Sequence, residues 1–171
     1  MYRTSTLLVA LLASGCAPSV LSSDAMLAAG TNRAFAHTVR VQAPPDSVWR
    51  LWTEVERWPD WDSELEHASL KGPFEQGARG RLVPVEGQSS SFRITELDVG
   101  RSYTFETKLP LSVLRIERSW VHVDSASVDI THAVSFHGVL GGVFARRFGP
   151  RFRQALPIAM ERIRQLAEAA P

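Results

Sequence analysis

Three ionisable side chains stand among apolar neighbours and are the best placed in this chain to do chemistry: His37, Arg118 and His132. Each belongs to a run in which apolar and polar residues alternate, so each is expected on the apolar face of a strand. Glu96 and Glu106 are candidate partners of Arg118, because an unpaired buried charge is very costly, although simple alternation puts Glu106 on the outer face. The three groups either orient a carbonyl, hydroxyl or carboxylate of a mostly apolar ligand, or belong to a structural network. A bulge that shifts the register would also explain their positions.

Recognised catalytic motifs are missing from the sequence. It has no glycine-rich phosphate loop, no cysteine pair for zinc and no His-Glu-x-x-His helix. His132 and His137 are five residues apart on one expected strand, so they face opposite sides and do not suit one metal. The charge is nearly balanced, with 19 basic and 18 acidic residues, which argues against nucleic-acid binding. We therefore predict no metal and no cofactor, and whether the chain is an enzyme stays open.

The first 15 residues have the composition of an export signal. Arg3 provides the positive charge, and residues 7–12 form an apolar core that is shorter than the roughly 20 residues needed to span a bilayer. The run Leu12-Ala13-Ser14-Gly15-Cys16 resembles the lipobox of bacterial lipoproteins, which implies that Cys16 carries a lipid. It is the lone cysteine, so the chain has no internal disulfide. An ordinary secretory peptide and a cytosolic protein with a misplaced start codon are the alternatives.

The sequence divides into a signal peptide (1–15), a tether (16–34) and one domain (35–171). The tether is rich in small polar residues, and the remainder suits a single core. Lipidation predicts that the protein is anchored in the cell envelope, at the outer membrane where one exists, because Ala17 rather than Asp follows Cys16. Secretion or a soluble periplasmic protein is the alternative.

Apolar periodicity predicts the first elements of the domain. Residues 35–41 alternate as a strand, and a short helix follows from Pro45 with an apolar stripe at Val48, Leu51, Trp52 and Val55. Pro59 should end this helix, with a second short helix over 59–66. Trp58 and Trp61 then flank a corner, where they either pack in the core or lie half-exposed near an opening.

Six further strands and a long helix complete the prediction. The strands, separated by turn signals, suit an antiparallel meander and are expected at 66–70, 78–84, 90–98, 103–109, 113–123 and 128–137. Residues 142–169 form a helix whose apolar face steps by three or four residues through Phe144, Phe148, Phe152, Leu156, Ala159, Ile163 and Leu166. Pro150 and Pro157 should kink or divide it. Such a helix can bury its stripe only against the concave face of the sheet.

This order of elements resembles the helix-grip fold of the START-like (SRPBCC) superfamily, in particular its polyketide cyclase/dehydrase branch. The resemblance covers about residues 35–169 and implies an α+β fold, in which a curved antiparallel sheet wraps around the C-terminal helix and two short helices follow the first strand. Similar proteins bind lipids, polyketides, hormones or quinones in a cavity, and the stretch that contains His132 tends to hold a polar residue there. The resemblance rests on the proline-bearing terminal helix and on four shorter segments. These segments are Ala43-Pro44-Pro45-Asp46-Ser47-Val48-Trp49, Trp58-Pro59-Asp60-Trp61, Gly77-Ala78-Arg79-Gly80 and Thr131-His132-Ala133-Val134-Ser135-Phe136-His137-Gly138.

The preferred hypothesis is a protein without catalytic activity that binds or carries a hydrophobic small molecule, such as a lipid, quinone or polyketide-like compound. Its pocket would measure roughly 300–1,000 Å³. An enzyme of the polyketide cyclase/aromatase kind and a protein-binding module are the alternatives. The residues predicted to bind the ligand are His37, Trp58, Trp61, Phe105, Arg118, Trp120, His132, Phe136, Phe148 and Phe152.

Basic residues gather on the terminal helix, where acidic ones are scarce before Glu161. They either form a solvated face whose stems cover apolar surface or contact anionic lipid headgroups. These arginines are Arg146, Arg147, Arg151, Arg153, Arg162 and Arg164.

Overall fold

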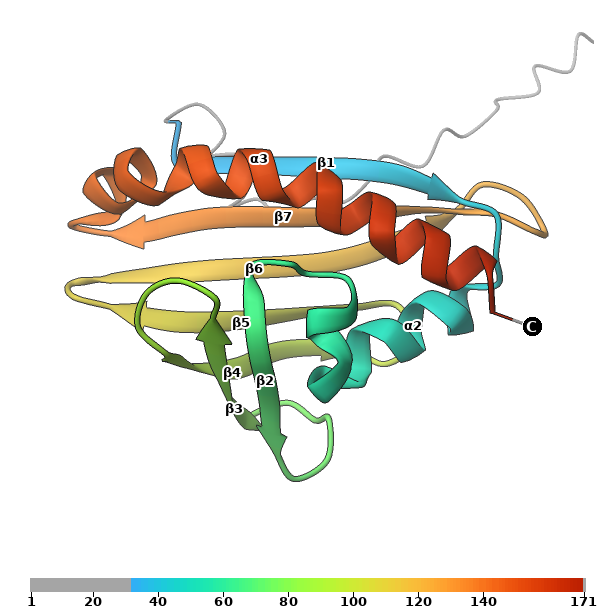
Figure 1. Ribbon diagram of the computed structural model, residues 1–171, viewed down its shortest axis with the longest axis horizontal. Helices are drawn as coiled ribbons and strands as arrows, with labels where there is room; N and C mark the ends of the chain where they lie inside the picture. Colours follow the sequence, from blue (N-terminus) through green and yellow to red (C-terminus); the bar gives the residue numbers. More distant parts are fainter. Residues whose placement is uncertain (1–31, 171) are drawn as a thin grey trace, which may run out of the picture.

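The computed structural model describes residues 32–170, which form one antiparallel sheet of seven strands, two helices and a 3₁₀ helix (Figure 1). The predicted signal peptide, Cys16 and nearly all of the tether lie outside the described residues. In chain order the elements are β1 (Ala34–Val41), α2 (Pro45–Thr53), η1 (Val55–Asp60), β2 (Leu65–Lys71), β3 (Arg79–Pro84), β4 (Ser90–Asp98), β5 (Ser102–Leu109), β6 (Ser112–His122), β7 (Val128–Gly138) and α3 (Gly141–Glu168).

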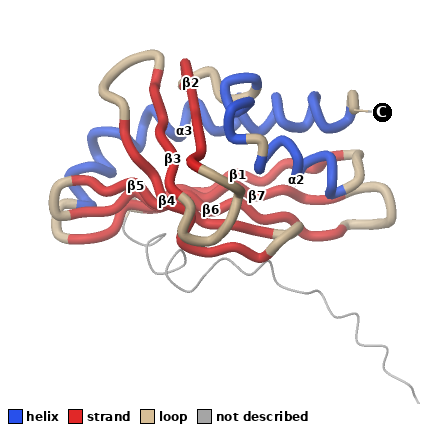
Figure 2. The backbone as a smooth tube through the Cα atoms, turned by 90° about the horizontal axis from the view of Figure 1, so that it is seen from below, coloured by secondary structure: helices blue, strands red, loops and turns tan. Residues whose placement is uncertain are grey.

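The strands follow one another as a meander, and β1 closes the sheet against the last strand. The spatial order is β1-β7-β6-β5-β4-β3-β2, with every neighbouring pair antiparallel. Both helices lie on one side of the sheet, toward which β2 and β3 curl (Figure 2). The predicted α+β fold, in which a curved antiparallel sheet wraps around a C-terminal helix, is therefore confirmed, and each strand lies within about two residues of its expected bounds.

The region after β1 differs from the prediction. The first helix ends at Thr53, because Glu54 leaves the helical conformation with φ −79° and ψ 75°, and Val55 belongs to the 3₁₀ helix η1. Pro59 lies inside η1 rather than ending the first helix, and β2 begins at Leu65 where a second helix was expected. The stripe itself is confirmed, since Val48, Leu51 and Trp52 are buried on α2 and Val55 on η1.

The long helix α3 is continuous through Pro150 and Pro157, so the prolines do not divide it. Its buried side also differs from the expected stripe. Small residues face the sheet in the N-terminal half, and Phe148 is 36% exposed. Positions four apart advance 400° around a helix, so a run of such steps drifts off one face. The residues buried on α3 are Gly141, Ala145, Gly149, Leu156, Ala159, Met160, Ile163 and Ala167.

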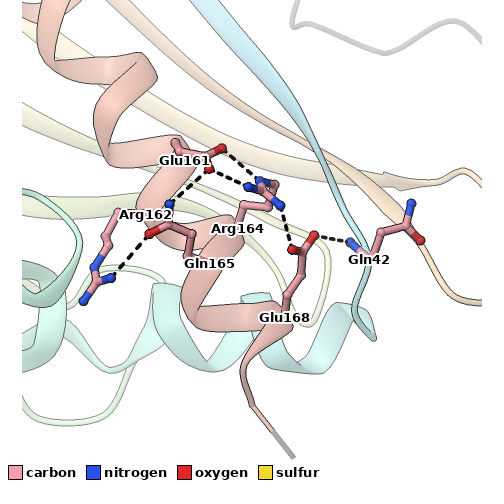
Figure 3. A network of polar contacts seen from close by, with 6 residues as sticks. All are labelled: Gln42, Glu161, Arg162, Arg164, Gln165 and Glu168. Carbon is pink, nitrogen blue, oxygen red and sulfur yellow. Dashed lines mark hydrogen bonds and ion pairs between the residues drawn. The ribbon is translucent and has the colours of Figure 1, made fainter.

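Polar contacts fix the C-terminal end of α3 (Figure 3). Arg164 binds Glu161 at 2.5 Å and Glu168 at 2.7 Å, and the backbone N–H of Gln42, just after β1, donates to Glu168 at 2.9 Å. The end of the helix is thereby held beside the end of the first strand. No helix within residues 32–170 combines the length and apolar character needed to cross a membrane.

Candidate functional site

Four polar side chains form a row across the interior face of the sheet. Tyr103 on β5 lies opposite Arg118 on β6, Arg118 lies opposite His132 on β7, and His132 lies opposite His37 on β1. Directly opposed residues of antiparallel strands point to the same face. The sequence prediction that His37, Arg118 and His132 share the interior face is therefore confirmed, and their role in ligand binding stays a prediction.

Arg118 is enclosed by aromatic rings and is only 2% exposed. Its guanidinium carbon lies 4.5 Å from the ring centroid of Trp58, 4.7 Å from Trp61, 5.3 Å from Phe105 and 5.5 Å from Tyr103. A cation over an aromatic face gains about 2 kcal/mol when it is desolvated. The rings therefore offset part of the cost of burying this charge, but they carry no negative charge of their own. These four rings are called the aromatic cage below.

No carboxylate of the described residues lies within ion-pairing distance of Arg118. The expected partners, Glu96 and Glu106, both pair instead with Arg115 on the outer face, at 2.6 Å and 3.8 Å. This expectation was wrong because Arg115 lies opposite Glu106, whereas Arg118 points to the other side of β6. The prediction that alternation places Glu106 on the outer face is confirmed.

Hydrogen bonds tie the cage to α2. Arg118 Nη1 donates to the Tyr103 hydroxyl, which in turn donates to the Trp52 carbonyl oxygen at 3.3 Å. Trp58 Nε1 donates to the same carbonyl at 3.0 Å. Two polar atoms of the row, Arg118 Nε and His132 Nδ1, have no partner within the described part of the chain. Since buried polar groups are nearly always paired, these two atoms retain hydrogen-bonding capacity that the described residues do not use.

Burial sets the protonation states of the row. It lowers the pKa of His132 well below 6.5, and the Arg118 charge lowers it further, so the imidazole is neutral at pH 7. Burial raises the pKa of Tyr103 to about 12, against the opposing effect of Arg118. Burial also raises the pKa of Asp62, which accepts a bond from the Glu64 N–H at 3.1 Å. At pH 7 Arg118 is therefore charged, whereas its neighbours Tyr103 and His132 are neutral.

Trp58 and Trp61 do not lie near an opening, which corrects one sequence interpretation. Both are buried, and both indole N–H groups bind backbone carbonyls of α2, Trp58 that of Trp52 and Trp61 that of Leu51 at 3.3 Å. These bonds fold η1 back under α2 and bring both rings over Arg118. The alternative interpretation, core packing, is the correct one.

The remaining predicted residues fall outside the cage or at its edge. Phe105 belongs to it, and Phe136 packs against Phe152 with ring centroids 6.1 Å apart. Phe148 stacks on Phe144 at 6.0 Å near the surface instead of lining the interior. Trp120 lies beyond the cage and donates its N–H to the Gly100 carbonyl at 2.8 Å. The ten residues therefore fall into a buried group around Arg118, a group of phenylalanines beside the N-terminal half of α3 (Phe136, Phe148 and Phe152) and Trp120, which lies apart from both.

Sequence reasoning missed two residues of the site. Tyr103 is not among the residues predicted to bind a ligand, because its contact with Arg118 depends on the β5–β6 register. Asp62 is not among them either, and its burial follows from the turn after η1. Periodicity within one strand could predict neither the contact of Tyr103 with Arg118 nor the burial of Asp62.

Apolar side chains stay half-buried at the edge of the interior, away from the cage. Leu65, Leu82, Leu109 and Leu114 on the strands and Phe144 and Phe152 on α3 pack against the core but remain partly exposed. Arg151 on α3 bridges this side by contacting Glu64 and, at 3.5 Å, Glu86. We call this region, between α3 and the edge formed by β2 and β3, the half-buried apolar edge. A shallow pocket of about 350 Å³ lies elsewhere, at Gln76, Gly77, Arg93, Ile94 and Thr95.

The row brings three kinds of polar group together. It offers one cation, one phenol and one neutral imidazole in an apolar setting, a combination that can polarise a carbonyl or hold an anion. Among residues 32–170, no three His, Cys, Asp or Glu side chains are grouped as metal ligands would be.

Comparison with known proteins gives a family and a fold. Residues 33–168 match the family described as polyketide cyclase/dehydrase and lipid transport. A search of curated proteins found no match.

Similar solved structures include the Zhui aromatase/cyclase from Streptomyces sp. R1128, 21% identical with a TM-score of 0.65, over 80% of this chain and 93% of that one. Norcoclaurine synthase from Thalictrum flavum, in complex with dopamine and hydroxybenzaldehyde, is 16% identical with a TM-score of 0.62, over 81% and 88%. A hypothetical protein from Helicobacter pylori is 9% identical with a TM-score of 0.69, over 96% and 99%. At these identities the likeness shows the fold alone, and this fold is the helix-grip arrangement expected from the sequence.

Proposed function

We propose that this chain, which belongs to the polyketide cyclase/dehydrase and lipid transport family, binds or carries a hydrophobic small molecule between its sheet and α3. The observation that carries the proposal is Arg118, a buried cation that forms no ion pair with a carboxylate of residues 32–170 and whose Nε has no partner there. Asp62 interacts with it only at longer range, where the Arg118 charge lowers the pKa of Asp62 against the larger, opposite effect of burial. A protein rarely keeps such a group unless something compensates it. A carbonyl, hydroxyl or carboxylate oxygen of a ligand would supply that compensation.

The apolar part of the ligand would extend from the polar row toward the half-buried apolar edge. His132 and Phe136 are four residues apart on β7, which corresponds to roughly 13 Å along a strand. Phe136 and Phe152 border this path, and Phe35 packs against Phe152 with ring centroids 6.4 Å apart. A lipid, quinone or polyketide-like compound combines such an apolar body with an oxygen at one end. His37, which neighbours His132 in the row, would lie beside that oxygen.

An enzyme is the second candidate, and one contact favours it. Arg118 donates to the Tyr103 hydroxyl, and this pair could polarise a substrate carbonyl in a water-poor interior. Two of the similar structures are described as an aromatase/cyclase and a synthase. No carboxylate of residues 32–170 forms an ion pair or hydrogen bond with the row, where it could act as a general base, so we rank binding above catalysis.

We also propose that Cys16 carries a lipid and that the protein is held in the cell envelope. The support is the sequence Leu12-Ala13-Ser14-Gly15-Cys16 after an apolar segment. A membrane-held binding domain would meet apolar ligands where they are most concentrated.

Mass spectrometry of the protein purified from its own membranes tests the proposed function. If the protein binds a ligand, one apolar compound should co-purify with it in a stoichiometric amount. This compound should be chemically unchanged after incubation with the protein. An enzyme predicts that a supplied compound is converted into a new product. Recovery of the protein with no bound compound, from several growth conditions, would contradict both and favour a protein-binding module.

A further inference from the structure

Three aliphatic side chains project into solvent at one end of the molecule. Leu111, in the β5–β6 turn, is 73% exposed; Val139, in the β7–α3 turn, is 81% exposed; and Val143, in the first turn of α3, is 49% exposed. The two turns touch, because the Leu140 N–H donates to the Leu111 carbonyl at 3.5 Å. Together Leu111, Val139 and Val143 form one surface, called the apolar end below.

The backbone at Leu111 makes this exposure costly. Its φ is 51°, in the left-handed region that glycine and asparagine adopt far more readily than leucine. The turn therefore holds an aliphatic residue that neither the backbone preference nor burial explains. Contact with an apolar environment outside the protein would account for it.

Basic side chains without acidic partners border the apolar end. Arg146 and Arg147 follow Val143 on α3, and neither forms an ion pair with a carboxylate of residues 32–170. Arg33 lies against the start of the helix, 3.0 Å from where a side chain on Gly142 would begin. The sequence from Val139 to Met160 contains no acidic residue. The other end of α3 differs, since Arg164 there is paired with Glu161 and Glu168 (Figure 3).

The N-terminal segment joins the fold at the same end. The Phe136 N–H donates to the Arg33 carbonyl at 2.9 Å, and Arg153 donates to the Asn32 carbonyl at 3.4 Å. Figure 1 shows the start of β1, the β5–β6 turn, the end of β7 and the start of α3 together on one side of the molecule. The 16 residues from Cys16 to Thr31 span at most about 55 Å, so an anchored chain would keep this end close to its membrane.

From these observations we infer that the apolar end docks on a lipid bilayer that contains anionic lipids. Leu111, Val139 and Val143 enter the interfacial region, and Arg33, Arg146 and Arg147 contact the headgroups. Protruding aliphatic tips among unpaired cations suit a soft, negatively charged surface better than a folded protein partner. Docking would also bring Phe148 and the half-buried apolar edge toward the bilayer, which supplies apolar ligands. The inference goes beyond ligand binding and does not depend on whether Cys16 is lipidated.

Vesicle flotation of the full chain carrying Cys16→Ser tests the inference, because this variant lacks the candidate lipidation site. Two probes are compared: vesicles of phosphatidylcholine alone and of phosphatidylcholine with phosphatidylglycerol in equal parts. We expect clear preference for the anionic vesicles, which high salt weakens. On these vesicles Arg146→Gln with Arg147→Gln should lower affinity about 30-fold, since each arginine contributes about 1 kcal/mol.

The aliphatic side chains are tested by Leu111→Asn with Val139→Asn, where asparagine also suits the left-handed backbone at position 111. We expect at least about a tenfold loss of binding to the anionic vesicles. The matched control is Val99→Asn with Arg101→Gln, in the β4–β5 turn at the opposite end of β5, where Val99 is 77% exposed. It should bind like the Cys16→Ser parent. Equal binding to both vesicle types, no binding to either, or equal losses in the control would overturn the inference. Ligand binding in solution stays measurable in every variant, so the two proposals fail separately.

Discussion

Arg118 and His132 are directly opposed on β6 and β7, and both point into the interior of the helix-grip fold. Arg118 is charged and His132 is neutral at pH 7, because burial and the Arg118 charge both lower the pKa of His132. Each retains a nitrogen without a partner in the part of the chain that the structure describes, Nε in Arg118 and Nδ1 in His132. The pair therefore offers unused hydrogen-bonding capacity in a place where water is scarce.

The first prediction concerns the charge of Arg118. Arg118→Met should weaken binding of a fluorescent fatty acid about 10- to 100-fold, because a hydrogen bond to a charged group contributes about 1.5–3 kcal/mol. The melting temperature should be kept or raised, since the substitution removes a buried charge that forms no ion pair with a carboxylate of the described residues. Fluorescence titration and thermal unfolding measure the two effects.

Two controls sharpen this test. Arg115→Met removes a guanidinium three residues away on the outer face, where it pairs with Glu96, and should leave affinity unchanged. The methyl ester of the same fatty acid should bind the wild type less tightly and lose little in Arg118→Met. Equal loss of acid and ester in Arg118→Met would show that Arg118 acts through packing instead.

The second prediction concerns pH and His132. Its folded pKa lies well below 6.5, so below that pH the unfolded chain takes up a proton that the folded protein refuses. Because the unfolded state then binds more protons, the free energy of unfolding falls by about 1.4 kcal/mol per pH unit as the pH drops below 6.5. His132→Leu should keep the fold, alter ligand binding and remove this part of the slope.

Denaturant unfolding of wild type and His132→Leu between pH 7 and 5 isolates the contribution of His132, since the other titrating groups are common to both. The difference in unfolding free energy should shift steadily in favour of the variant as the pH falls. Parallel pH profiles would contradict a neutral buried imidazole. An unfolded variant would assign His132 to structure, and His132→Gln would then be compared instead.

The sequence predicted the fold well because period-two alternation is a local signal. Alternation placed His37, Arg118 and His132 on one face, and the structure confirms that placement. It could not identify what surrounds Arg118, because those contacts join distant segments. Trp58 reaches the guanidinium only after η1 folds back onto Trp52, and that depends on hydrogen bonds rather than periodicity.

Helical periodicity failed at Phe148 for a related reason. A four-residue spacing looks continuous along the sequence but drifts around the helix axis, so the sheet instead meets Ala145 and Gly149. Small residues give a weak apolar signal, although they permit the closest approach of helix and sheet. The buried side of α3 was therefore predicted only in its C-terminal half, where Leu156 and Ile163 are confirmed as buried.

The third prediction concerns Cys16 and follows from the sequence. Growth of the native host with a labelled fatty acid should mark the wild type and leave Cys16→Ser unmarked. The variant should also move from the membrane to the soluble fraction. Its fold should not change, because Cys16 precedes the described domain. Wild-type protein that stays unlabelled while a known lipoprotein in the same cells is labelled would contradict lipidation.

The last prediction tests how the sheet supports the aromatic cage. Gly80 on β3 lies under the ring of Phe92, which stacks on Trp58 with centroids 5.4 Å apart. A Cβ at position 80 would press against that ring and lie 2.5 Å from the Ser69 carbonyl oxygen. Gly80→Ala should therefore lower the free energy of unfolding by about 1–3 kcal/mol, as overpacking does.

A double-mutant cycle separates this clash from a general effect of losing glycine. Phe92→Leu withdraws part of the ring, so Gly80→Ala should cost less in that background, by at least about 0.5 kcal/mol. Gly72→Ala is the matched control: its added Cβ meets no atom within 4 Å, and its cost arises from the backbone, with φ 88°. It should not couple to Phe92→Leu. Denaturant unfolding measures the three single variants and the two double variants that contain Phe92→Leu. Additive costs for Gly80→Ala and Phe92→Leu would contradict a clash between the added Cβ and the Phe92 ring, which stacks on Trp58.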